Sequence, residues 1–140
     1  GSAGGYLALM VGLSDDKTGP GGDPQAKHSA KVSAVIDFYG VVNFSKHGKG
    51  VVPGVSAAEQ AAYLPENQCD PQDPPVLILH GTADDTVWLS IHSEALAVEA
   101  PDARLTRLDG IGHMPHHVVE DEILAALNRL AKDAFGETTK

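Results

Sequence analysis

Several features that would direct a protein to particular functions are scarce in this sequence. It contains one cysteine, Cys69, so it can form no internal disulfide and offers no thiolate cluster to a metal ion. Its 10 Lys and Arg face 19 Asp and Glu, a formal net charge of −9, whereas a nucleic-acid surface needs clustered positive charge. Apolar runs such as residues 76–79 are far shorter than the roughly 18 residues that a membrane span requires. We therefore expect neither nucleic acid nor a membrane as a partner.

The composition is that of an ordinary globular domain. The 140 residues are 42% hydrophobic and 21% charged, which suits one domain and is too short for two well-filled ones. The acidic residues are spread along the chain, a pattern typical of a solvated surface. Asp70 and Asp73 lie close to Cys69 in sequence, and neighbouring carboxylates raise a thiol pKa. We therefore interpret Cys69 as incidental rather than as a nucleophile.

The hydropathy pattern predicts strands that alternate with helices. Apolar runs rich in β-branched residues indicate buried strands, and apolar stripes at helical spacing indicate helices. Ser56 and Glu59 form a capping box for a short helix, and Gly136 ends the last one. In chain order the predicted elements are a helix at 3–13, a strand at 31–39, a helix at 57–64, a strand at 76–79, a helix at 90–99, a strand at 104–108 that alternates like an edge strand, and a helix at 118–135. Residues 15–30 and 43–54 are predicted loops.

Strands separated by helices imply right-handed crossovers and a parallel sheet, so the expected fold is α/β with a three-stranded parallel sheet and flanking helices. Ligands bind at the carboxyl ends of such strands. A serine, an aspartate and a histidine stand at places of this kind: Ser2 directly before the first helix, Asp84 after the second strand and His113 after the third. The chain order Ser, Asp, His is the order that α/β-hydrolases use.

Four segments resemble motifs of that superfamily. Residues 1–8 (GSAGGYLA) are similar to the nucleophile elbow and following helix of carboxylesterases and prolyl-oligopeptidase-like hydrolases. Residues 80–87 (HGTADDTV) resemble the loop that carries the triad acid, and residues 110–115 (GIGHMP) resemble the terminal loop that carries the catalytic histidine. Residues 35–40 (VIDFYG) are similar to the strand before the acid loop in the acyl-esterase branch. The resemblance covers nearly the whole chain.

The resemblance implies a serine esterase that acts through an acyl-enzyme, with a small-molecule ester, either a carbohydrate acetate or another small acyl ester, as substrate and with no cofactor. Ser2 would be the nucleophile, His113 its general base and Asp84 the carboxylate that orients His113. The backbone N–H of Ala3 would supply half of the oxyanion hole. The Gly that the elbow pattern requires two positions before Ser2 lies upstream of Gly1.

The same resemblance implies that this chain is the C-terminal part of a single α/β-hydrolase domain. The strands before the elbow and the loop that completes the oxyanion hole would then lie outside it. An unpaired apolar edge on the first strand is an aggregation hazard. We therefore expect a partner there, either the N-terminal half of the same fold or a second copy, and little activity without that half.

Several alternatives stay open at this stage. Asp85 could replace Asp84 as the acid, or either could only cap a turn. His116 and His117 lie near His113, but no familiar zinc spacing is complete, so no metal is expected. His80 is interpreted as a structural residue that packs beneath the acid loop. Trp88 has two open interpretations: it lines the pocket, or it covers the acid loop. A serine peptidase, a non-catalytic binding protein of the same fold and a flavodoxin-like domain are the competing functions.

Overall fold

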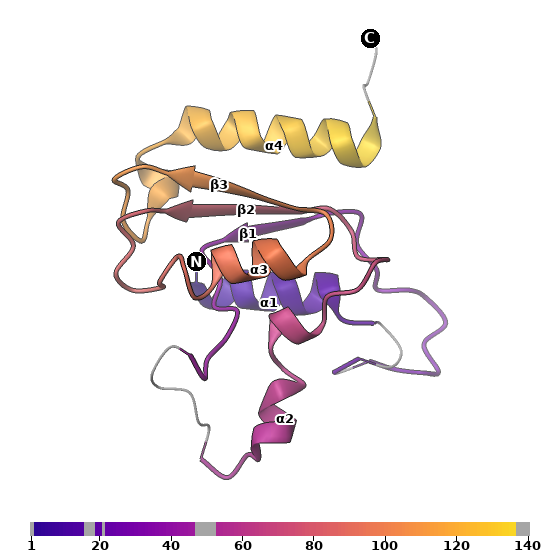
Figure 1. Ribbon diagram of the computed structural model, residues 1–140. Coiled ribbons are helices and arrows are strands. Elements are labelled where there is room, and N and C mark those ends of the chain that lie inside the picture. The colour runs from indigo at the N-terminus through magenta and orange to yellow at the C-terminus, as the bar shows by residue number, and fades with distance from the viewer. Residues whose placement is uncertain (1, 16–18, 21, 47–52, 137–140) are drawn as a thin grey trace.

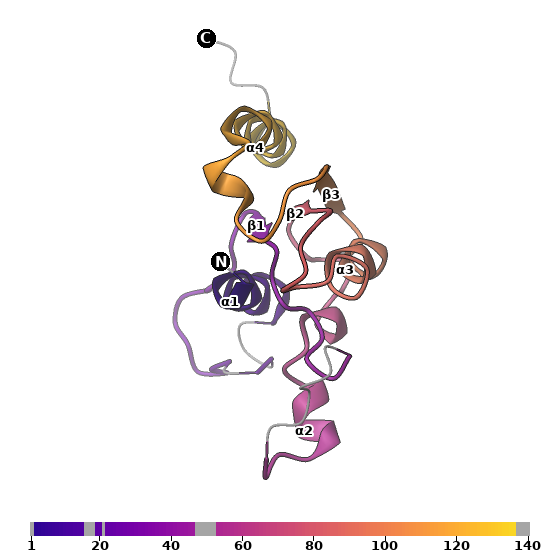
Figure 2. The same cartoon turned by 90° about the vertical axis from the view of Figure 1, so that its left-hand side faces the viewer.

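The computed structural model describes residues 2–15, 19–20, 22–46 and 53–136. Its centre is a parallel sheet in the order β1-β2-β3, formed by β1 (Val35–Phe38), β2 (Val76–Gly81) and β3 (Ala103–Leu108). The helices α1 (Ser2–Leu13) and α3 (Ser93–Glu99) lie against one face of the sheet, and α4 (Glu120–Phe135) lies against the other (Figures 1 and 2). The predicted α/β class and three-stranded parallel sheet are confirmed.

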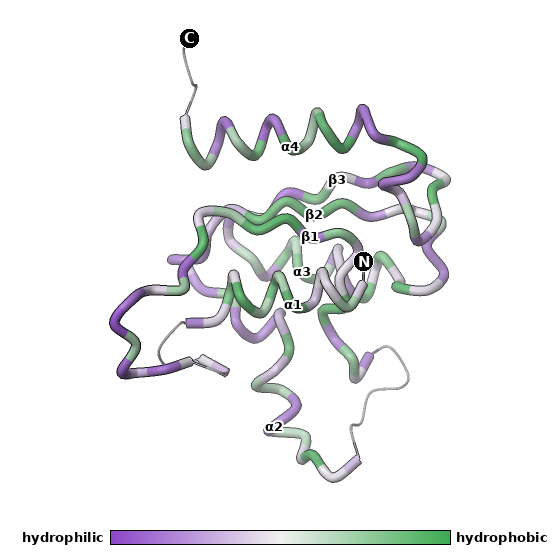
Figure 3. Tube along the Cα trace, turned by 180° about the vertical axis from the view of Figure 1, so that it is seen from behind, coloured by the Kyte–Doolittle hydropathy of each residue, from purple (hydrophilic) through white to green (hydrophobic). Residues whose placement is uncertain are grey.

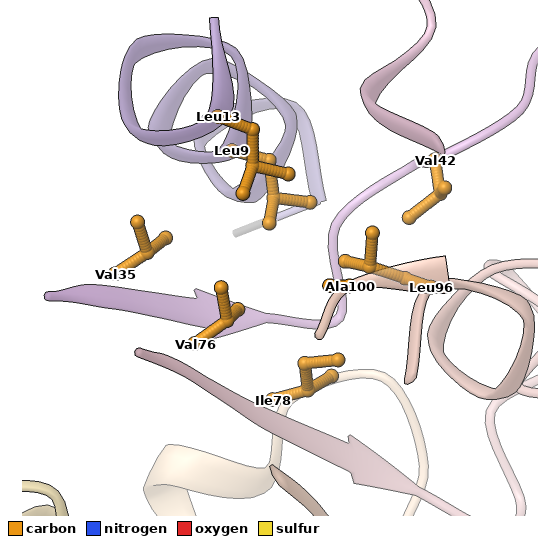
Figure 4. Packing of buried hydrophobic residues seen from close by; sticks show 8 residues of the cluster. All are labelled: Leu9, Leu13, Val35, Val42, Val76, Ile78, Leu96 and Ala100. Carbon is orange, nitrogen blue, oxygen red and sulfur yellow. The ribbon is translucent and has the colours of Figure 1, made fainter. Parts of the chain in front are cut away.

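The sheet is held between two apolar layers because its central strand alternates its side chains between both faces. Val76 and Ile78 of β2 pack with residues of α1 and α3, and Figure 4 shows this cluster: Leu9, Leu13, Val35, Val42, Val76, Ile78, Leu96 and Ala100. Leu77 and Leu79 point the other way and pack against the apolar stripe of α4: Ile123, Ala126 and Leu130. All six residues of β2 are buried, as a continuous apolar run predicts for the middle of a parallel sheet.

The first strand is shorter than predicted, Val35–Phe38 instead of residues 31–39. The partner strand β2 explains where it begins. Val35 pairs opposite Val76, and the N–H of Val35 already bonds to the carbonyl of Pro75. Because proline has no N–H to offer a ladder, residues before Val35 find no regular pairing there. At the other end Tyr39 turns out of the strand with a φ of 46°.

The remaining elements differ from prediction mainly at their ends. The strand predicted at 76–79 continues through His80 and Gly81, which pair with Arg107 and Leu108 of β3. The helix α2 (Ala57–Ala61) begins at the expected Ser56–Glu59 capping box. It ends early because Leu64, which precedes Pro65, is extended.

Two helices begin later than predicted because turns precede them. Before α3, the carbonyl of Trp88 accepts the N–H groups of Ile91 and His92. Before α4, the 3-10 turn η2 (Pro115–His117) directly precedes the predicted start, and the N–H groups of Val118 and Val119 both bond back to the carbonyl of Pro115, so the helix begins at Glu120 and not at residue 118. A second 3-10 turn, η1 (Pro65–Asn67), follows α2. The edge position of β3 and the end of α4 at Gly136 are as predicted.

Some predictions fall partly outside the described residues. Gly1 of the elbow motif lies outside them, as do parts of the loops predicted at 15–30 and 43–54. Over the ranges that are described, no helix combines the length and apolar character needed to cross a membrane.

Candidate active site

The segments predicted to carry the site gather at one edge of the sheet. Figure 1 shows the loops after β2 and β3 leaving the carboxyl ends of their strands, on the side where α1 begins. Asp84 lies on the first loop, His113 on the second, and Ser2 is the first residue of α1. This edge is where an open α/β sheet binds ligands.

Asp84 is buried and held by the turn that it begins. Its Oδ1 accepts the backbone N–H groups of Thr86 and Val87, each at 2.9 Å. Burial by itself raises the pKa of Asp84, but the bonds from Val87, His113 and Thr86 together outweigh burial, so its pKa lies below the usual value. The side chain is therefore a carboxylate with a fixed orientation at neutral pH.

His113 contacts the other oxygen of that carboxylate. Its Nδ1 lies 2.8 Å from Oδ2 of Asp84, which leaves Nε2 of a partly exposed ring available to another group. Asp85 is exposed, so Asp84 and not its neighbour is the acid that contacts His113. The neutral tautomer that satisfies this bond carries its proton on Nδ1.

The two loops are joined by main-chain contacts. The N–H of Ala83 bonds to the carbonyl of Ile111 at 2.9 Å, and the N–H of Gly110 bonds to the hydroxyl of Thr82 at 2.9 Å. Gly110 has a φ of 70°, a conformation that glycine adopts without steric cost. These bonds fix the histidine loop against the acid loop, so the Asp84–His113 distance rests on backbone rather than on side chains alone.

Tyr39 packs against the ring of His113, a contact that the sequence did not predict. Its buried ring lies 4.6 Å from the ring of His113, centroid to centroid, at 59°. The hydroxyl lies 3.3 Å from Nδ1 of His116 and 3.7 Å from the sulfur of Met114. A positive φ in a bulky residue is strained, and such strain gathers at functional sites. The only sequence signal was its position at the end of a strand before Gly40.

Ser2 and Ala3 occupy the first turn of α1, where helix N–H groups lack intrahelical partners. The carbonyl of Ser2 accepts the N–H of Val41 at 3.4 Å, which ties this turn to the segment after β1. Within the described part of the chain, no hydrogen bond joins the hydroxyl of Ser2 to His113. The structure thus brings Asp84 and His113 together and places Ser2 at the same edge without a direct contact.

The other candidates have simpler settings. The rings of His116 and His117 lie 4.1 Å apart, centroid to centroid, and are tilted by 46°. The described residues contain no group of three or more His, Cys, Asp or Glu placed to hold a metal ion. Trp88 is about half exposed. Cys69 is partly buried, and burial together with nearby Asp73, Glu99, Glu66 and Asp70 raises its pKa to about 11, which removes it as a nucleophile at neutral pH.

A parallel sheet with helices on both faces, and an Asp–His pair on the loops after its last two strands, defines the C-terminal part of an α/β-hydrolase. Solved structures bear this out. An esterase from Thermogutta terrifontis with bound butyrate superposes with a TM-score of 0.73 at 24% identity, over 100% of this chain and 56% of that one. A truncated carbohydrate esterase from gut microbiota gives 0.64 at 22%, over 92% and 57%. The Thermogutta esterase phosphorylated by paraoxon gives 0.70 at 23%, over 99% and 54%.

The family follows from the sequence match. The model of the BD-FAE family matches residues 1–99, and the chain belongs to that family. No curated protein matches. The chain spans little more than half the length of the esterases that it resembles in structure. Fold and family therefore agree with the resemblance drawn from the motifs.

Proposed function

We propose that this chain carries the catalytic triad of a serine esterase, with Ser2 as nucleophile, His113 as base and Asp84 as acid. The observation that carries the proposal is the 2.8 Å bond between Asp84 Oδ2 and His113 Nδ1. That bond directs Nε2 of His113 away from the acid loop. A serine hydroxyl needs such a base to become a nucleophile, and the base needs a carboxylate to fix its tautomer.

The reaction then follows the two steps of acyl transfer. His113 takes the proton of Ser2 as its oxygen attacks the ester carbonyl, and it returns the proton to the departing alcohol. Water then attacks the acyl-enzyme by the same route. The N–H of Ala3 in the first turn of α1 supplies one donor to the oxyanion, and one such donor contributes about 3 kcal/mol to the transition state.

A fluorophosphonate probe tests the nucleophile. In the full-length protein it should label Ser2, Ser2→Ala should abolish labelling, and Ser90→Ala, which changes an exposed serine near the acid loop, should leave it unchanged. Labelling that persists in Ser2→Ala would assign the nucleophile elsewhere.

Neighbours of similar fold were solved with butyrate and propionate, so we propose short acyl esters as substrates. Faster turnover of p-nitrophenyl butyrate than of the octanoate supports this, and preference for a peptide anilide contradicts it.

We further propose that the free edge of β1 receives the remaining strands of the same fold. In the described part of the chain β1 pairs only with β2, and exposed apolar residues flank its other edge: Leu7, Val11, Val32 and Ile36. Figure 3 shows α1 apolar along most of its length. The structural neighbours contain more than 40% of their length beyond the part matched here, and an unpaired apolar edge favours pairing.

Co-expression with the upstream segment of its natural reading frame tests this surface. We expect a 1:1 complex by light scattering, active against short esters, that Ile36→Lys disrupts and Val98→Lys does not. Val98 is an exposed apolar residue on α3, away from β1, and is 82% exposed. A stable dimer of the isolated chain that Ile36→Lys dissociates would instead assign the edge to a second copy.

A further inference from the structure

His80 is a buried imidazole whose two nitrogens are both occupied. It lies on β2, and its side chain has no exposed surface. Nδ1 is 2.5 Å from the hydroxyl of Ser93, while Nε2 is 2.8 Å from the carbonyl oxygen of Val87 and 3.2 Å from Oδ2 of Asp84. The ring therefore spans from the start of α3 to the acid loop.

These partners allow only one tautomer of the neutral ring. A carbonyl oxygen can only accept, so Nε2 of His80 must carry a hydrogen. Burial lowers the pKa of His80, so the ring is neutral at physiological pH and Nδ1 is unprotonated. The hydroxyl of Ser93 must then donate to Nδ1. Its donation stabilises the tautomer with the hydrogen on Nε2.

The Nε2–H of His80 faces two oxygens of the turn formed by residues 84–87, one at the start of the turn and one at its end. Oδ2 of Asp84 and the carbonyl of Val87 both face it, and Val87 in turn donates its N–H to Oδ1 of Asp84. Thr86 and Val87 belong to the loop, whereas His80 belongs to the central strand. His80 is therefore the side chain that ties the carboxylate to the rigid sheet.

We propose that Ser93 and His80 are positioning residues for Asp84: the Ser93 hydroxyl anchors the imidazole of His80 through Nδ1, and the Nε2–H of that ring holds Oδ2 of Asp84 toward His113. The inference rests on the proposed role of Asp84 as triad acid, but its hydrogen bonds are observable without turnover. With the other tautomer, a lone pair on Nε2 would face both Val87 O and Asp84 Oδ2, which is repulsive.

Long-range ¹H–¹⁵N spectra of the 140-residue chain at about pH 8.5, above the ordinary imidazole pKa of about 6.5, test the proposal. In the unchanged chain His80 should be protonated on Nε2 and His113 on Nδ1. Ser93→Ala should leave Nε2 of His80 protonated, because the carbonyl of Val87 still requires a donor, but it should release the ring from α3. His113 should then lose much of its Nδ1–H form because Asp84 is displaced. Ser90→Ala, an exposed serine close to Ser93 in sequence, should change neither ring.

A second pair of variants keeps the test decisive if Ser93→Ala does not fold. The amide N–H of His80→Gln can replace the Nε2 donor, whereas His80→Leu has none, so the Nδ1–H form of His113 should survive in the first and fall at least several-fold in the second. An unchanged His113 spectrum in Ser93→Ala, or equal His113 spectra in His80→Gln and His80→Leu, overturns the proposal. Loss of labelling or esterase activity with these spectra intact would count against the proposed function alone.

Discussion

Gly81, the last residue of β2, lies directly against the carbonyl of Ile111, two residues before His113. A Cβ atom at position 81 would collide with that oxygen and would lie 2.6 Å from the carbonyl oxygen of Gly112. Both atoms are backbone, so the histidine loop cannot yield by moving a side chain. The absence of a side chain at Gly81 is thus what lets the histidine loop approach the acid loop closely enough for Asp84 to meet His113.

Gly81→Ala should therefore displace the histidine loop. We expect a loss of about 1–3 kcal/mol in the free energy of unfolding, the usual cost of overpacking, and about a 10²-fold fall in kcat, because a displacement near 1 Å has that effect. Gly112→Ala is the matched control, since its Cβ would meet only the carbonyl of Ala83, at 3.9 Å. Urea denaturation of the chain measures the first effect, and ester hydrolysis by its complex with the upstream segment measures the second. Equal behaviour of the two variants would contradict the prediction.

Asp84→Asn should leave the fold nearly intact and abolish most activity. The amide preserves the shape of the side chain and an oxygen for the N–H groups of Thr86 and Val87, but it cannot hold His113 in the tautomer that serves a serine. In the complex with the upstream segment, ester hydrolysis should show a fall in kcat of about 10⁴-fold with a small change in KM. Asp85→Asn, at the exposed neighbouring position, should change kcat less than twofold. The reverse ranking would assign the acid to Asp85.

The packing of α1 on β1 depends on Gly5. A Cβ there would strike Oδ1 of Asp37 and lie 2.7 Å from Cα of Gly40, whereas a Cβ at Gly4 has nothing within 4 Å. Gly5→Ala should thus destabilise the chain by about 1–3 kcal/mol. Gly4→Ala should stabilise it by about 0.5–1 kcal/mol, since alanine is the better helix former. Thermal denaturation of the two variants gives shifts of opposite sign, and two shifts of the same sign would contradict this packing.

Asp37 should make stability depend on pH. Its carboxyl is fully buried, Oδ1 accepts the N–H of Gly40, and Oδ2 has no hydrogen-bond partner among the described residues. Burial raises its pKa to about 7, above the unfolded value of about 3.9. The folded state therefore binds the proton more tightly, and this stabilisation is complete below about pH 4 and is lost as the pH rises to about 7.

The matched variant isolates this effect. Asp37→Asn cannot titrate, so the free energy of unfolding of the unchanged chain minus that of the variant should fall by up to about 1.4 kcal/mol per pH unit between pH 4 and 7. Urea denaturation at a series of pH values measures the difference. A difference that stays constant over this range would show that the buried carboxyl does not titrate with a raised pKa.

Local sequence patterns were enough to predict the order of the elements. Period and composition identify β2 as a buried strand and α4 as an amphipathic helix, because a side chain's burial repeats with the geometry of its own segment. Asp84 and His113 were also singled out from the sequence, since each follows a strand within a segment that resembles a family motif, and the structure brings the two side chains into contact. The capping box of Ser56 and Glu59 is equally local, with both partners inside one turn.

Tertiary structure decided what depends on residues far apart in the chain. Pro75 shortens β1 although 40 positions separate it from Val35. The support of His113 by Tyr39 and the contact of His80 with Ser93 join different elements, and no period within one segment encodes them. The buried carboxyl of Asp37 also follows from packing, because Gly5 and Gly40 close over it only when α1 meets β1. The sequence alone determined which segments become helix or strand and which residues could react; packing determined which side chains hold them in place.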